Sequence, residues 1–142
     1  MKGSRWRSRI LAAAGGLVAL VVLAVAADAG VKSAPRTTVV KSGSSGWAYG
    51  ALGTARNSPN SSEYIECGVY AYSTPSTGPA YGWCFAYDSG SNGAYCSTAT
   101  ESQVKAIMAS SGDSFIYFSF DGSGTCTYLS ITSGSMYEPK QP

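Results

Sequence analysis

Residues Ala80–Asp88, AYGWCFAYD, decide the fold class. Large aromatic residues occupy every second position from Tyr81 to Tyr87, and small residues or a cysteine occupy the positions between them. A period of two is the spacing of a β-strand whose two faces differ in chemistry. The stretch Glu63–Tyr72, EYIECGVYAY, alternates in the same way, and the turn-forming residues STPSTGP separate the two. The pair predicts an antiparallel hairpin.

Further strands and one helix surround this hairpin. Thr100 with Gln103 matches a helix capping box. An apolar stripe at helical spacing follows, formed by Val104, Ile107 and Met108. The order predicts an α+β domain, with one small antiparallel sheet of about five to six strands and one short helix packed on one face. A small all-β barrel is the alternative. The other strand-like runs are 47–52, 94–98, 115–120 and 126–131.

The first 29 residues have the pattern of a signal peptide. A basic start is followed by the apolar run Ile10–Ala27 and then by small residues that suit cleavage. An uncleaved membrane anchor is the alternative, because about 18 apolar residues can just span a bilayer. Residues 30–46 are rich in Ser and Gly and predict a flexible linker, and residues 134–142 predict a loose tail. The folded domain is therefore expected at 47–133.

The charge balance argues against a nucleic-acid partner. The whole chain carries a formal charge of +2, with ten Lys and Arg against eight Asp and Glu. Four of the basic residues lie in the signal peptide, so six basic and seven acidic residues remain from Gly30 onward. A near-neutral mature chain lacks the basic surface that nucleic-acid binding requires. We expect no nucleic-acid partner, and membrane contact only if the N-terminal segment stays uncleaved.

All four cysteines follow the signal peptide. An even number of cysteines in a small exported domain predicts two disulfides and a secreted protein. The absence of histidine and of any CxxC pair argues against a zinc site. Cys84 and Cys96 lie opposite each other if the loop between them centres on Gly90, which favours the pairs Cys84–Cys96 and Cys67–Cys126. The main alternative is Cys67–Cys84 with Cys96–Cys126.

Alternation sorts the strand residues into two faces. One face collects small and aliphatic side chains, on which the helix can pack. The other collects aromatic rings with polar tips, which suit recognition surfaces and stacking on sugar rings, and it includes Tyr117 and Tyr128 of the later strands. Because one short helix can cover only one face, we expect the aromatic face to be partly exposed. Ordinary cross-strand packing is the alternative interpretation. The predicted ligand-binding residues are Tyr70, Tyr72, Tyr81, Trp83, Phe85 and Tyr87.

One observation warns that the faces are not continuous. Cys126 falls on the aromatic side of this alignment, whereas Cys67 and Cys84 fall on the other side. A single β-bulge shifts a strand by one residue and would move all later side chains to the opposite face.

Catalytic groups are scarce. The chain has no histidine, which removes the commonest general base, and disulfide-bonded cysteines cannot act as nucleophiles. Glu63 and Glu66 are three residues apart on one strand, so they point to opposite faces. Asp88 and Asp121 each begin a Gly- and Ser-rich loop that offers only one carboxylate to a calcium ion. Turns stabilised by the Asp side chain are the simpler interpretation, and we expect no catalytic residue, metal or cofactor.

These observations predict a secreted, non-enzymatic domain that binds a glycan or a protein surface through its aromatic face. A small hydrolase or hydrolase inhibitor that uses Glu66 or Asp88 is one alternative. A structural envelope protein, held by an uncleaved N-terminal helix, is another.

Overall fold

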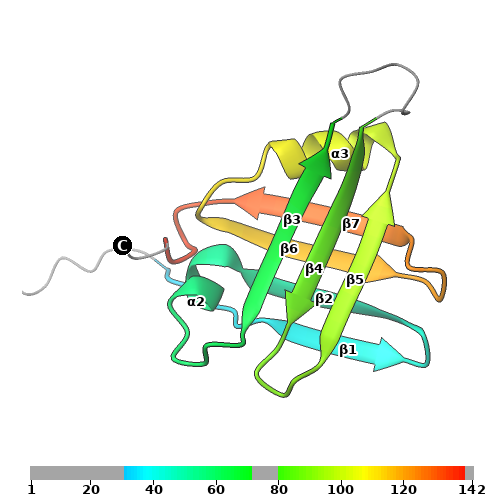
Figure 1. Ribbon diagram of the computed structural model, residues 1–142. Coiled ribbons are helices and arrows are strands. Elements are labelled where there is room, and N and C mark those ends of the chain that lie inside the picture. The colour runs from blue at the N-terminus through cyan, green and yellow to red at the C-terminus, as the bar shows by residue number, and fades with distance from the viewer. Residues whose placement is uncertain (1–30, 72–79, 140–142) are drawn as a thin grey trace, which may run out of the picture. The chain divides into compact units, whose positions relative to one another are not determined.

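The alternating stretches form seven strands in two antiparallel sheets (Figure 1). The structure is a computed structural model that describes residues 31–71 and 80–139. Two short helices complete the described part of the chain. In chain order the elements are β1 (Thr38–Ser42), β2 (Ser45–Ala51), α2 (Leu52–Arg56), β3 (Tyr64–Tyr70), β4 (Tyr81–Tyr87), β5 (Gly93–Thr98), α3 (Glu101–Met108), β6 (Ser114–Phe120) and β7 (Cys126–Ser133).

The two sheets form the two layers of a sandwich. One sheet has the order β1-β2-β6-β7 and the other the order β3-β4-β5. Their strands run across one another when the layers are viewed face on (Figure 1). The protein is thus mainly β with a little helix, and the single sheet that we expected is divided into two. The division has a simple cause: both hairpin groups have an apolar face, and each buries that face against the other.

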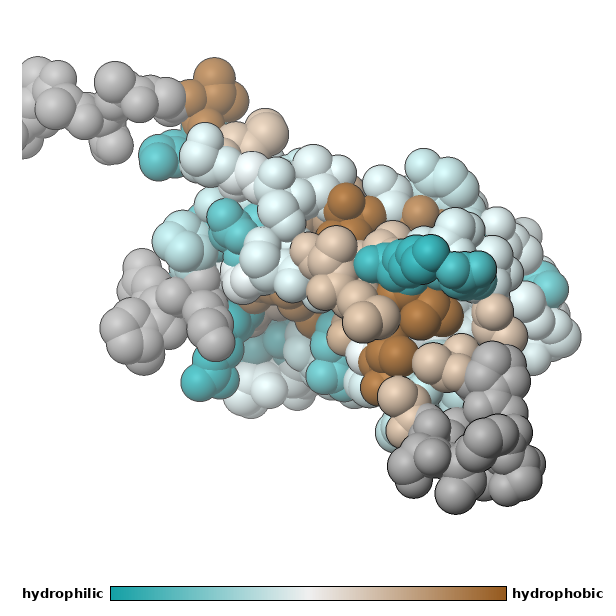
Figure 2. Space-filling model, turned by 90° about the horizontal axis from the view of Figure 1, so that it is seen from above, coloured by the Kyte–Doolittle hydropathy of each residue, from teal (hydrophilic) through white to brown (hydrophobic). Residues whose placement is uncertain are grey.

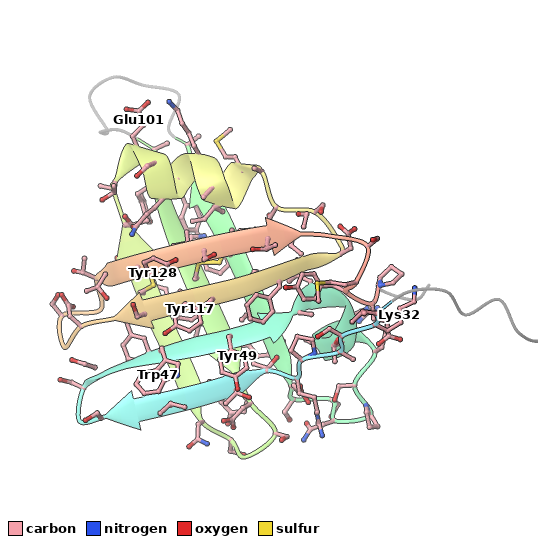
Figure 3. The ribbon with its side chains drawn as sticks, turned by 180° about the vertical axis from the view of Figure 1, so that it is seen from behind. Lys32, Trp47, Tyr49, Glu101, Tyr117 and Tyr128 are labelled. Atoms are coloured by element: carbon pink, nitrogen blue, oxygen red, sulfur yellow. A yellow bond between two sulfur atoms is a disulfide. The ribbon has the colours of Figure 1, made fainter. Side chains whose placement is uncertain are left out.

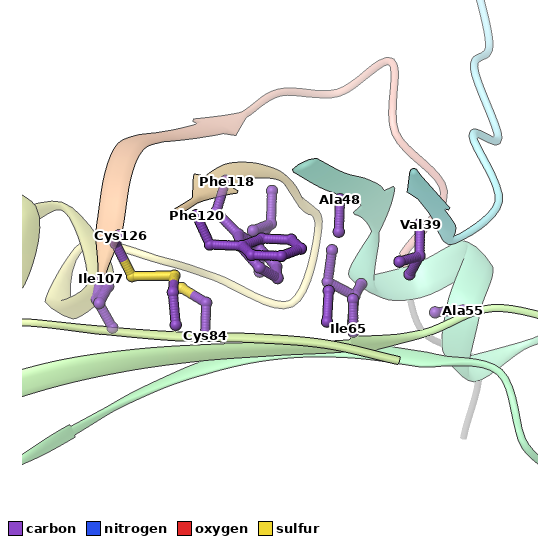
Figure 4. Close-up of a cluster of buried hydrophobic side chains, with 13 residues drawn as sticks. Val39, Ala48, Ala55, Ile65, Cys84, Ile107, Phe118, Phe120 and Cys126 are labelled. Carbon is purple, nitrogen blue, oxygen red and sulfur yellow. A yellow bond between two sulfur atoms is a disulfide. The ribbon is translucent and has the colours of Figure 1, made fainter. Parts of the chain in front are cut away.

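The core lies between the layers (Figure 4). Phe118, Ile116 and Cys84 are fully buried, and Ile65 faces them from β3. These are the small and aliphatic sides of the strands that alternation predicted, so the sorting into faces is confirmed for β3, β4 and β6. Many core side chains are small, including alanines in β2, β4 and β5. Small core side chains allow the two layers to pack close together. Because they bury little apolar area, the disulfides supply an important part of the stability.

Helix α3 closes one end of the sandwich, where it packs against β3, β4 and β7. Val104 and Ile107 are buried as predicted, whereas Met108 is 72% exposed. The predicted capping box is wrong: Thr100 makes no side-chain cap bond, and the Gln103 amide donates to the Cys126 carbonyl instead (3.4 Å). Seen from above, this end of the domain shows hydrophobic residues around a hydrophilic strip (Figure 2).

The two disulfides are Cys67–Cys84 and Cys96–Cys126. Our favoured pairing was wrong and the alternative is confirmed. Cys84 lies on the central strand β4, directly opposite Cys67 on one side and Cys96 on the other, so alternation within the sheet could not choose between them. Cys126 decides the pairing, because the opposite layer brings it to Cys96. Cys67–Cys84 therefore links two neighbouring strands of one sheet, and Cys96–Cys126 joins the two layers.

A β-bulge explains the position of Cys126. Phe120 pairs with Cys126 and Ser119 pairs with Tyr128, so Thr127 is an extra residue in β7. The bulge turns Cys126 into the core while Tyr128 stays outside. The irregularity that the sequence indicated is thus present at this point.

Two segments expected outside the fold belong to it. Residues 38–46 of the expected linker form β1, a turn and the start of β2, because the β-branched residues Thr38–Val40 pair with β2. The expected loose tail packs on α2 and β6: a Cβ on Gly53 would lie 1.6 Å from the Glu138 carbonyl oxygen, and the Tyr137 ring stacks on Phe115 (5.4 Å between centroids). The predicted signal peptide at 1–29 lies outside the described residues.

Candidate functional site

The outer surface of β3-β4-β5 carries the largest group of predicted site residues. Because the inner surface of this sheet faces the core, alternation directs the other half of its side chains outward. None of these outward side chains is fully buried. We call this surface the aromatic face, formed by Tyr64, Tyr70, Tyr81, Trp83, Phe85, Tyr87 and Tyr95.

Ring contacts across the strands connect much of the aromatic face. Tyr64 stacks on Phe85, with 5.3 Å between ring centroids, and lies 6.1 Å from Tyr87. Phe85 also contacts Tyr95 of β5 at 6.3 Å. At the other end of β3, Tyr70 contacts Tyr81 (5.2 Å) and Trp83 (6.1 Å). Such pairs stabilise the sheet and hold the rings in fixed positions.

Trp83 occupies a special position on this surface. Its cross-strand neighbours are Gly68 on β3 and Ser97 on β5, and both are small. A Cβ built on Gly68 would lie 2.6 Å from Trp83 Cζ2, so the indole covers the glycine. Only glycine allows this approach, and the result is a broad ring lying on the sheet.

The aromatic face remains open to solvent. Tyr70 is 52% exposed, Tyr95 48% and Tyr64 40%. The four aromatic residues of β4 are half-buried by their neighbours, and in the described part of the chain no second layer covers them. Partial burial, followed by the effects of Glu66 and Tyr87, raises the pKa of Tyr64, so its hydroxyl stays protonated and able to donate.

Five of the six predicted site residues lie together on this face, and Tyr72 lies outside the described residues. The prediction missed Tyr95, although it alternates with Ala94 and Cys96 in β5 and could have been found from that spacing. The sequence had also grouped Tyr117 and Tyr128 with these residues. They belong instead to the other sheet.

The outer surface of that sheet is a second aromatic surface (Figure 3). The rings of Tyr49 and Tyr117 lie 6.5 Å apart, and Tyr117 meets Tyr128 edge-on at 5.8 Å. Trp47 is next to them on β2, opposite Ser119. No Asp, Glu, Lys or Arg lies among the outward residues of β2, β6 and β7. A single-sheet interpretation of the sequence could not distinguish this surface from the first.

The two Asp loops act as turns. Asp88 Oδ1 accepts the backbone N–H groups of Gly90 (2.8 Å) and Asn92 (2.9 Å). Asp121 Oδ1 accepts those of Ser123 (2.9 Å) and Thr125 (3.0 Å). In residues 31–71 and 80–139 no group of three or more Cys, Asp or Glu side chains is placed to hold a metal ion.

Glu63 is a buried carboxylate with several partners. It pairs with Arg36, accepts the Thr37 N–H (2.8 Å) and accepts the Ser58 hydroxyl (2.8 Å). Burial alone would raise the pKa of Glu63, but the hydrogen bonds from Arg36, Ser58 and Thr37 outweigh it and leave the pKa below its ordinary value. Glu63 is therefore an ionised structural group.

A hollow beside β3 is lined by both Glu63 and Glu66. A glycosidase needs one carboxylic acid with a raised pKa opposite a second carboxylate. Glu63 has the opposite pKa shift, and Asp88 is engaged by its own loop. Burial raises the pKa of Asp88, but bonds from Asn92, Gly90 and Val39 outweigh it and lower the pKa overall. Glu63 and Asp88 therefore serve as structural hydrogen-bond acceptors, Glu63 for the backbone N–H of Thr37 and Asp88 for its own turn and the N–H of Val39.

No protein-family model, curated protein or solved structure matches this chain. Among residues 31–71 and 80–139, no helix is long and apolar enough to cross a membrane. The two disulfides indicate an oxidising environment of the extracellular type.

Proposed function

We propose that this protein is a secreted, non-enzymatic binding module, and that its aromatic face binds a neutral glycan. The observation that carries the proposal is the open set of rings on β3-β4-β5, with Trp83 lying flat over Gly68. An indole face of this kind stacks on the apolar side of a sugar ring, while tyrosine hydroxyls bond to sugar hydroxyls. Glu66 is the only charged residue among the outward residues of the sheet, which favours an uncharged ligand.

A pair of tryptophan variants tests the proposal. Trp83→Ala removes the central ring of the aromatic face, and Trp47→Ala removes a ring of the same size from the opposite sheet. We expect Trp83→Ala to weaken binding to a panel of insoluble neutral polysaccharides about tenfold or more, and Trp47→Ala to leave it unchanged. Thermal unfolding of both variants serves as the control. Equal loss of binding and stability in Trp83→Ala would identify Trp83 as a packing residue.

Fluorescence provides a second readout, because the chain has only three tryptophans. With Trp6 and Trp47 replaced by Phe, Trp83 is the only indole, and ligand should change its emission. With Trp6 and Trp83 replaced by Phe, the remaining Trp47 should not respond. Emission changes confined to Trp47 would transfer the site to the other sheet. If polysaccharides change the emission of neither indole, and soluble proteins bind instead, the ligand class is a protein surface.

Secretion is tested by sequencing the N-terminus of the exported protein. The signal-peptide proposal expects a start at Ala27, Asp28 or Gly30. An intact Met1 in the membrane fraction would support the anchored alternative.

A further inference from the structure

The edge strands of the two sheets differ in whether their outward backbone N–H and C=O groups are hydrogen-bonded or covered. Edge strands expose unpaired N–H and C=O groups, which natural proteins usually cover or block. In the described residues, the N–H of Thr37, just before β1, and the outward N–H of Val39 on β1 are bound by the carboxylates of Glu63 (2.8 Å) and Asp88 (3.3 Å). Ser97 of β5 donates to the Gly124 carbonyl of the other layer (2.9 Å). Helix α3 packs against β7.

The outer edge of β3 has no such cover. Asp88 donates its N–H to the Asn92 carbonyl, so the even-numbered residues of β4 bond to β5. The odd-numbered residues of β4 therefore bond to β3, through the even-numbered residues of β3. The N–H and C=O groups of Ile65, Cys67 and Val69 must then point away from the sheet. Within the described chain, no backbone or side-chain group hydrogen-bonds to them.

The distance across β3 and β4 agrees with this assignment. Cys67 and Cys84 have their Cα atoms 4.1 Å apart. Directly opposed residues without mutual hydrogen bonds approach to about 4.5 Å, whereas hydrogen-bonded pairs stay near 5.5 Å. Cys67 is therefore in a non-bonded pair, with its backbone groups at the free edge.

The second layer extends past this edge. In Figure 1, α2 and the ends of β6 and β7 lie beyond β3, on the side away from β4. Between them is the hollow beside β3, with Leu52 and Ala55 of α2 on one side and residues 110–112 on the other. The sheet β3-β4-β5 thus ends at β3 while the other layer continues past it. The hollow at this position is lined by the apolar side chains of Leu52, Ala55 and Ile65 together with polar residues such as Ser58, Ser61 and Ser110.

We propose that the edge of β3 binds an extended segment of a partner polypeptide, which adds to the sheet as a fourth strand. The partner is defined by chemistry: a backbone that bonds to Ile65, Cys67 and Val69, and small or aliphatic side chains at every second position to face Leu52 and Ala55. A second copy of this chain fits less well, because it would bring its own second layer into the space that α2 and residues 110–112 occupy. This site is separate from the aromatic face and does not depend on the proposed glycan.

Amide hydrogen exchange on the unliganded protein tests the first step. We expect fast exchange at Ile65, Cys67 and Val69, and exchange at least tenfold slower at Glu66 and Gly68, whose amides bond to β4. Slow exchange at all five amides in dilute protein would mean that the edge is already occupied, and would overturn the proposal.

The second step uses a random decapeptide library displayed on phage, selected against the exported protein, with the best sequence then synthesised. The proposal expects this peptide to slow exchange at Ile65, Cys67 and Val69 at least tenfold. Val69→Pro removes one outward N–H without breaking the ladder and should weaken binding about tenfold. Trp83→Ala and Trp47→Ala should bind normally.

Several results would overturn the proposal. They are the absence of any selected peptide, protection of amides elsewhere, or loss of peptide binding in Trp83→Ala. Protection of the β3 edge that grows with protein concentration and accompanies a sedimenting dimer would identify a second copy as the occupant. Protection present only while residues 1–30 remain attached would identify that segment instead. If Val69→Pro does not fold, the exchange pattern of the unmodified protein still decides.

Discussion

The loop after β4 and the loop after β6 have nearly the same local chemistry and different places in the fold. In each, one Asp oxygen accepts two backbone N–H groups of its own turn. Asp121 is half-buried and bonds only within its loop. Asp88 is buried, and its second oxygen accepts the Val39 N–H of the other sheet. The comparison shows that a short motif determines a turn, while its surroundings decide whether that turn also joins two layers.

The disulfide that joins the strands leaving the two loops should have the largest effect. Replacing Cys96 and Cys126 by Ala opens a loop with a separation of 30 residues, whereas replacing Cys67 and Cys84 opens one of 17. Loop-closure entropy predicts losses of about 3.7 and about 3.1 kcal/mol. We expect a wider gap, because only Cys96–Cys126 connects the layers. Urea denaturation of both double variants measures it, and a larger loss for Cys67–Cys84 would contradict the argument.

Replacement of the two Asp residues should have the second-largest effect on stability. Asp88→Ala leaves buried N–H groups of the loop and of Val39 without their acceptor, and we expect a loss of about 2 kcal/mol. Asp121→Ala leaves its loop amides free to bond to water, so its loss should be much smaller. Thermal and urea unfolding of the two variants compare them directly. Equal losses would show that the contact between Asp88 and Val39 contributes nothing.

The loss of stability at low pH should also depend more on Asp88 than on Asp121. Hydrogen bonds to the ionised forms leave the pKa values of Glu63 and Asp88 below their ordinary values. The stability that they supply is therefore complete above their unfolded pKa values of about 4 and is lost as the pH falls through the lower folded values. We expect a constant Tm between about pH 7 and 5 and a steep fall below about pH 4. Hydrogen bonds from Ser123 and Thr125 also lower the pKa of Asp121, but this carboxylate bonds only within its own loop. The fall should therefore be clearly shallower in Asp88→Asn and change less in Asp121→Asn.

Backbone conformation should produce the smallest effects. Ser91 has a φ of 66° in the first loop and Gly124 a φ of 78° in the second. Gly124→Ala meets no atom within 4 Å, so its cost of about 1 kcal/mol would come from the left-handed conformation alone. Ser91→Gly relieves the same strain and should be neutral or slightly stabilising. Tm measurements compare the two, and a stabilising Gly124→Ala would contradict the assignment.

Much of the local structure could be predicted from the residues. Period-two alternation placed β3, β4, β5, β6 and β7 within one or two residues of their observed ends. The same alternation separated core from surface side chains. It failed at β1, where scattered Ser, Gly and charge hid a β-branched strand. It also failed at α2, because a helix of five residues is too short to show a helical period in the sequence.

The candidate site was predictable residue by residue but not as a surface. Alternation says that Trp83 and Phe85 share a face with Tyr70, and the structure agrees. It cannot say which sheet a strand joins, so Tyr117 and Tyr128 were grouped with the wrong surface. The open edge of β3 was equally hidden, because an edge is defined by the neighbour that a strand lacks.

The sequence by itself determined the strands, their faces and the two turns, since these depend on residues a few positions apart, and its four cysteines indicated two disulfides. The tertiary structure alone decided that there are two sheets, that Cys96 bonds to Cys126, and that Asp88 reaches β1. These features depend on burying two apolar faces against each other, which is a property of the whole domain. The opening loops illustrate the difference: each Asp makes its own turn, and only the packing of the layers gives Asp88 a second role.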